Sequence, residues 1–166
     1  VLLLAGRFIT GVACGGSITT YLLESVRVTK QMKAERNYHC FYQLLTAAAS
    51  GAEYNSLGGD IKKAWFLGEA KNFHYLNQSG CVKIDGVNDG EDFATLVKQL
   101  RGMRVPEDTL KRLFRLLAAL LHLGDINFAE EKARGNEGSR VKQEAIAKGA
   151  KESRLQVVAQ LLEVAP

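Results

Sequence analysis

The sequence predicts a mainly α-helical fold with a few short strands. Three segments carry this prediction, because each repeats apolar residues every three to four positions; they are Lys33–Ala49, Glu91–Met103 and Pro106–Leu123. The chain has 166 residues, of which 46% are apolar and 24% are charged. That mixture is typical of a soluble globular protein, and the length suffices for one domain with its own core.

The first helix is predicted over Lys33–Ala49. Its apolar stripe recurs at one-turn spacing, and Ser50-Gly51 ends it; the stripe is formed by Tyr38, Phe41, Tyr42 and Leu45. The next apolar group, Trp65-Phe66-Leu67, is expected to dock the following segment onto the core. Turn-forming residues then precede the helix at Glu91–Met103.

The clearest helix is predicted from Pro106 to Leu123. Proline suits the first turn of a helix, where its missing N–H costs nothing, and Glu107 and Asp108 follow at the positive end of the helix dipole. A broad apolar face indicates that the helix is largely buried. Gly124 is expected to cap its C-terminal end.

Less of the chain is predicted to be extended. Ile18–Val28, rich in β-branched and aromatic residues, is predicted to be a strand that runs into a loop, and Ile126–Phe128 a short strand or turn edge. Ala129–Arg140 is predicted to be a charged loop. One or two helices follow, the last with Ser153 as its N-cap.

Composition disfavours several classes of function. The formal charge of +4 is spread along the chain, which argues against nucleic-acid binding. The longest apolar stretch, Leu113–Leu123, contains Arg115 and His122 and is too short to span a bilayer, which takes about 20 residues. The cysteines, Cys14, Cys40 and Cys81, have neither zinc-site nor disulfide spacing, so we expect free thiols in a reducing compartment.

No segment presents a convincing catalytic or metal-binding motif. The glycine-rich stretch Gly11–Ser17 lacks the lysine of a phosphate-binding loop and is interpreted as a tight turn. The three histidines (His39, His74, His122) lack partners at ligand spacing and are interpreted as structural. The acidic cluster (Asp85, Asp89, Glu91, Asp92) fits an EF-hand loop poorly and is better explained by turn formation and helix capping.

The charged stretch Glu130–Gly135 allows two interpretations. It can be a solvated surface loop, or a loop that contacts a partner through charge and is sensitive to salt. The residues alone favour the first.

Four longer stretches together resemble the myosin head family in content, order and spacing. They are ITTYLLESVRV (Ile18–Val28), AERNYHCFYQLL (Ala34–Leu45), FHYLNQSGCVKIDGVNDGEDF (Phe73–Phe93) and LFRLLAALLHLGDINF (Leu113–Phe128). The likeness covers Gly15–Val164, and residues 1–14 lie outside it. The stretch from Phe8 to Tyr21 is several residues shorter than the family pattern.

This resemblance implies that the chain is a partial motor domain, residues 1–166, from an α/β P-loop NTPase. It corresponds to part of the upper 50-kDa subdomain after switch I. Myosin heads hydrolyse MgATP through a P-loop, switch I and switch II. None of these motifs lies within the chain, except that Arg7-Phe8-Ile9 corresponds to the distal end of switch I. The resemblance therefore assigns no catalytic, cofactor-binding or metal-binding residue here.

The resemblance also implies partners. The family carries a loop that approaches actin at the position of Ala129–Arg140, which makes Glu130, Glu131, Lys132 and Arg134 candidate actin-facing residues. Light chains or calmodulin would bind only through a neck outside this chain, and neither nucleic acid nor a membrane span is implied. The expected location is the cytoplasmic actin cytoskeleton.

Within a complete head, the role expected for this segment is mechanical. The helix at Pro106–Leu123 would form a rigid packed core, and the strand at Ile18–Val28 would transmit sheet distortion. The alternative interpretation is a stand-alone helical interaction module or a non-functional fragment.

Overall fold

The computed structural model describes residues 26–51, 53, 55–133, 136–146 and 151–165. Within them the structure is mainly helical, as predicted, with one two-stranded sheet. The longer helices are α3 (His39–Ala49), α6 (Asp89–Gly102), α7 (Glu107–Leu123) and α8 (Arg154–Leu162). The short elements are η1 (Val26–Val28), α4 (Ile61–Ala64), η2 (Ala70–Asn72) and α5 (His74–Asn77). The strands are β1 (Phe128–Ala133) and β2 (Asn136–Val141).

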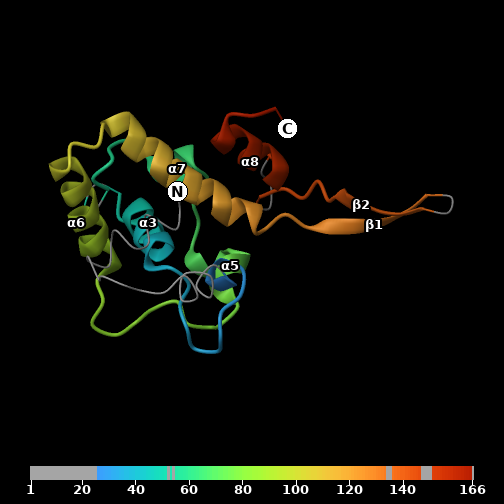
Figure 1. The fold of residues 1–166 in the computed structure, drawn as a ribbon, viewed down its shortest axis with the longest axis horizontal. Helices are drawn as coiled ribbons and strands as arrows, with labels where there is room; N and C mark the ends of the chain where they lie inside the picture. Colours follow the sequence, from blue (N-terminus) through green and yellow to red (C-terminus); the bar gives the residue numbers. More distant parts are fainter. Residues whose placement is uncertain (1–25, 52, 54, 134–135, 147–150, 166) are drawn as a thin grey trace, which may run out of the picture.

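The core forms around α3, which packs against α6, while α7 packs against α8 (Figure 1). Most of α3 is buried, including Phe41, Leu44 and Ala47. Phe93 of α6 meets Phe114 of α7 with ring centroids 4.9 Å apart, which joins the two pairs of helices. Each buried side chain of this size contributes roughly 1.5–3 kcal/mol. Trp65 and Leu67 are also buried, so the predicted docking of that segment is confirmed.

The predicted start of the first helix was wrong. The helix begins at His39 rather than Lys33. Ala34 has a φ of 65°, which an α-helix does not allow, and the Asn37 side chain accepts a hydrogen bond from the Tyr38 N–H. Polar contacts therefore fix residues 33–38 in an irregular conformation, and the apolar stripe alone did not reveal them.

The predicted strand at Ile18–Val28 is only partly within the described residues. Its last part, Val26–Val28, forms the 3₁₀ turn η1 rather than a strand. The Val26 carbonyl accepts hydrogen bonds from the N–H groups of both Thr29 and Lys30. Because this turn engages the Val26 carbonyl, the carbonyl is not available to pair with a neighbouring strand.

The remaining helix boundaries lie close to the predictions. The helix predicted at Glu91 begins at Asp89, where the Asn88 side chain accepts hydrogen bonds from the Gly90 and Glu91 N–H groups. Pro106 is the N-cap of α7, which ends at Leu123. Ser153 caps α8 as predicted, in a reciprocal arrangement with Gln156.

Candidate partner-binding hairpin

The segment predicted to be a charged loop, Ala129–Arg140, is instead most of an antiparallel hairpin. The register pairs Phe128 with Val141, Glu130 with Ser139 and Lys132 with Glu137. The prediction was wrong because the strands lack the alternating apolar residues that identify a half-buried sheet. Pairing between the strands satisfies their backbone groups although the ribbon covers no core.

The hairpin extends well away from the packed helices (Figure 1). Among the four candidate partner-contacting residues, Glu130 is exposed, Glu131 and Lys132 lie on β1, and Arg134 falls outside the described residues. Phe128, at the base of the ribbon, is 63% exposed. The described part of the ribbon thus presents Glu130 and Arg140 to solvent.

The root of the hairpin is closed by polar contacts. The Lys142 N–H donates to the Asn127 carbonyl at 2.8 Å, and the Asn127 side-chain amide donates to the Glu144 carboxylate at 2.9 Å. The Glu144 carbonyl in turn accepts from the Arg154 N–H at 2.9 Å. The hairpin is therefore attached at its base to the first turn of α8.

Asp125 connects this root to the rest of the fold. Its carboxylate, in a residue 8% exposed, accepts from the His74 N–H at 2.7 Å and lies 2.6 Å from the Arg154 guanidinium. One side chain thus links the end of α7, the start of α5 and the start of α8. A buried carboxylate is tolerated only with such compensation, because an unpaired buried charge is costly.

His122 lies one turn before Asp125 and is buried. Its Nε2 donates to the Trp65 carbonyl at 3.0 Å, and its ring meets Phe73 edge-on at 5.4 Å. Burial lowers the pKa of His122 below its ordinary value of 6.5, although the hydrogen bond to Trp65 and the charge of Asp125 oppose that shift. The neutral imidazole therefore belongs to the folded state, in keeping with a structural role.

We expect the stability of the chain to decrease as pH falls below about 6.5. A depressed pKa in the folded state means that the unfolded chain binds the proton first, so the contribution of His122 is complete above this value and lost below it. His122→Gln, which keeps a donor for the Trp65 carbonyl, should flatten the dependence. Chemical unfolding from pH 7.5 to 5.0 checks this, and equal slopes in both proteins would contradict it.

Gly124, in the same turn, lies in close contact with the Tyr75 ring of α5. It caps α7 with a φ of −63°, so the left-handed conformation usual for a capping glycine does not account for it. A Cβ at this position would lie 2.6 Å from a ring carbon of Tyr75. The glycine is needed because α5 packs directly on the end of α7.

Gly124→Ala should therefore destabilise the chain by roughly 1–3 kcal/mol, the usual cost of overpacking. Gly102→Ala is the matched control, since nothing lies within 4 Å of a Cβ built there. Urea unfolding of both variants measures the difference. Equal stabilities would show that Tyr75 moves aside freely.

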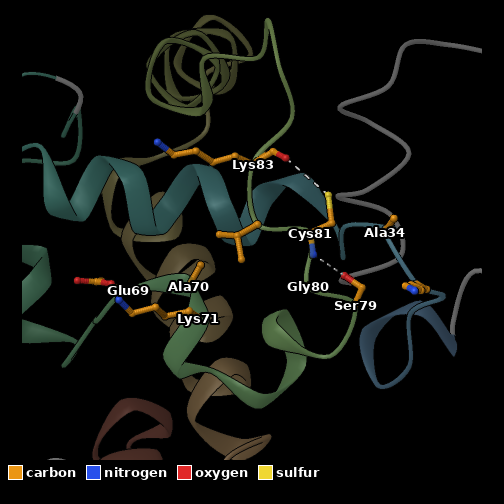
Figure 2. A pocket seen from close by; sticks show the side chains of 10 residues that line it. Ala34, Glu69, Ala70, Lys71, Ser79, Gly80, Cys81 and Lys83 are labelled. Atoms are coloured by element: carbon orange, nitrogen blue, oxygen red, sulfur yellow. Dashed lines mark hydrogen bonds and ion pairs between the residues drawn. The ribbon is translucent and has the colours of Figure 1, made fainter.

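A hollow of about 620 Å³ lies beside Glu69–Lys71 and Ser79–Lys83. Figure 2 shows the side chains that line it. Ala70 and Val82 lie in it, the lysines 33, 71 and 83 surround it, and Lys71 pairs with Glu69 at 2.6 Å. The Cys81 N–H donates to the Ser79 hydroxyl at 3.2 Å. In the described structure Glu69 is thus paired with Lys71, and the Ser79 hydroxyl is engaged by a backbone N–H.

Other chemistry is limited in the described part of the chain. Burial raises the pKa of the Cys40 thiol to about 11, so it is a poor nucleophile. No group of metal-binding side chains comes together among these residues. No helix within them is both long and apolar enough to cross a bilayer. Cys14 and the glycine-rich stretch Gly11–Ser17 lie outside the described residues.

Sequence reasoning did not single out the polar residues that support the hairpin root. Asp125, Asn127 and Arg154 fix the hairpin root, and none was singled out. One signal was available: the polar residues Asp125 and Asn127 come directly after the apolar helix that ends at Leu123. Polar residues at the end of a core helix indicate a turn whose side chains are hydrogen-bonded to the protein.

Comparison with known proteins places the chain in context. The family described as Myosin head (motor domain) matches residues 8–165. A Myosin-I heavy chain from Dictyostelium discoideum is 40% identical over 114 residues, which is 69% of this chain and 4% of that protein. Myosin-17 from Arabidopsis thaliana is 41% identical over 118 residues, covering 71% and 7%. Unconventional myosin-XV from Homo sapiens is 34% identical over 160 residues, covering 96% and 4%.

Proposed function

Since this chain belongs to the myosin head family, we propose that it is the structural and actin-facing part of an ATP-driven cytoskeletal motor. The chain spans between 4% and 7% of the length of the relatives compared. Activity, substrate and partner therefore belong to the whole protein. The proposed location is the cytoplasmic actin cytoskeleton.

The projecting hairpin is the observation that carries the actin-facing role. It extends beyond the helices (Figure 1). Its root is attached to α7, α5 and α8 through Asp125 and Glu144. A protruding ribbon on a fixed base can meet a large partner without rearrangement of the core. Force on the ribbon would reach the helices through the same contacts.

Charge is proposed to govern the contact. Lys132 and Arg134 would face acidic groups of the filament, whereas Glu130 and Glu131 would be repelled by them. Contacts of this kind mainly affect the rate of encounter and the orientation of the partners. Salt at about 0.1–0.15 M screens exposed charges that lie more than about 8–10 Å apart. We therefore expect a weak, salt-sensitive contribution rather than the whole affinity of a motor for actin.

MgATP is the proposed cofactor of the whole motor. Phosphoryl transfer depends on groups that position magnesium, phosphate and water, and we assign none of them to this chain. Its proposed contribution is mechanical: α7 supplies packed core, and the hairpin supplies contact. Exposed apolar side chains fit a chain that packs against further protein; among them are Leu123, Phe128, Leu162 and Val164.

The actin contact is tested by cosedimentation of the chain with actin filaments. Lys132→Ala with Arg134→Ala should weaken binding by about 3- to 10-fold at low salt, the modest size expected for charge contacts that water screens. The effect should shrink at 0.15 M salt, on the order of physiological ionic strength. Glu130→Gln with Glu131→Gln should strengthen binding.

The matched control is Lys62→Ala with Lys63→Ala, which removes the same charge from the exposed side of α4. The control should bind as the unaltered chain does. If both pairs weaken binding equally, only net charge matters and the hairpin has no special role. If the unaltered chain does not sediment with actin, the actin-facing proposal fails for this segment.

A further inference from the structure

We propose that α5, the four-residue helix at His74–Asn77, mechanically couples the hairpin root to the Val26–Lys30 segment. These regions are far apart in sequence. The coupling is a property of the folded chain alone, so it does not rest on the proposed actin contact. Through this coupling, a displacement of the hairpin root would loosen the hydrogen bonds of the Val26–Lys30 segment.

On the hairpin side, α5 is attached at its first residue. The His74 N–H donates to Asp125 at 2.7 Å, and the Tyr75 ring packs so closely on Gly124 that a Cβ would overlap it. Both contacts come from the turn between α7 and β1. A shift of that turn must therefore move the start of α5 or break a buried hydrogen bond.

On the opposite side, α5 is attached through the Asn37 side chain, which is in a residue 1% exposed. The Asn37 amide nitrogen donates to the Tyr75 carbonyl at 2.8 Å and to the Val28 carbonyl at 3.0 Å. Its amide oxygen accepts from the Tyr38 N–H at 2.7 Å. One buried amide thus joins α5 to the Val26–Lys30 segment.

A second contact reinforces this connection. Gln78, directly after α5, donates from its side-chain amide to the Thr29 carbonyl at 2.9 Å. Leu76, between the two attachment points, is completely buried. Because Leu76 fixes α5 in the core and polar contacts fix both of its sides, α5 is expected to move as one body.

The cost of broken hydrogen bonds favours joint movement of α5 and the Val26–Lys30 segment over their separation. A buried donor or acceptor that loses its partner costs roughly 1–3 kcal/mol, and the Asn37 amide would lose its bond to the Tyr75 carbonyl if α5 moved away. Moving the Val26–Lys30 segment together with α5 preserves these bonds. The path from Asp125 through α5 to Val28 consists entirely of such contacts.

Amide hydrogen exchange of the chain tests the coupling. The Thr29 and Lys30 N–H groups, which both donate to the Val26 carbonyl, report on the Val26–Lys30 segment. Asp125→Asn should accelerate their exchange by about fivefold or more, the lower range of coupling between sites. The reverse should also occur: Asn37→Ala should accelerate exchange of the Lys142 N–H at the hairpin root.

The control is Val97→Ala, which creates a small cavity in α6 away from the path. It should accelerate amide exchange in α6 at least as much as at Thr29 and Lys30. If Asp125→Asn prevents folding, Arg154→Gln perturbs the same carboxylate from a more exposed position and should accelerate the same two amides. The coupling is overturned if these amides respond no more than those of α6. Actin binding plays no part in the readout, so the two proposals can fail separately.

Discussion

Leu117→Asp is expected to abolish the cooperative unfolding transition of this chain. Leu117 is 4% exposed on the buried face of α7. Removing a buried leucine alone costs roughly 2–5 kcal/mol, and an unpaired carboxylate in its place costs more. A domain is typically stable by only about 5–15 kcal/mol, so this one change can unfold it.

The matched control is Leu123→Asp, on the same helix. Leu123 is 45% exposed, so the new charge remains in water. Thermal unfolding followed by circular dichroism should show a transition for Leu123→Asp and none for Leu117→Asp. Similar transitions in both variants would contradict the burial of this face of α7 in the core.

Asp89→Ala is expected to have the second largest effect. The Arg36 guanidinium lies 2.8 Å from the Asp89 carboxylate and 3.8 Å above the Tyr42 ring, and the Arg36 side chain is 1% exposed. Removal of one partner leaves the other charge buried without compensation, which costs about 3–5 kcal/mol. Urea unfolding measures the loss.

Asp92→Ala is the control for this prediction. Asp92 lies in the same first turn of α6 but is exposed, so it loses only its interaction with the helix dipole, at most about 1 kcal/mol. A further variant, Arg36→Met with Asp89→Leu, removes both charges and should recover much of the stability. Equal losses in the two single variants would show that the Arg36–Asp89 pair adds nothing specific.

The helical part of the fold could be predicted because its signals are local. α6, α7 and α8 have apolar periodicity together with a cap or a proline at the start, and their observed boundaries lie within two residues of the predicted starts at Glu91, Pro106 and Ser153. The family also followed from the sequence, because the four resembling stretches are long. The match over residues 8–165 confirms it.

What could not be predicted depends on partners distant in sequence. Asp89 was interpreted as one of several turn and cap residues, yet it is the counterion of Arg36, 53 positions earlier. Asn37 bonds to Tyr75, 38 positions later, and this displaces the start of α3. The hairpin was taken for a loop because pairing between two polar strands leaves no periodic apolar signal.

Actin-activated hydrolysis of MgATP by the native protein that contains this chain tests the central claim most directly. The protein can be captured with an antibody raised against Gly80–Phe93 and assayed with and without actin filaments. Membership of a working myosin head predicts that hydrolysis rises when actin is added. A captured protein that neither hydrolyses MgATP nor responds to actin would contradict the motor function and favour a stand-alone binding module.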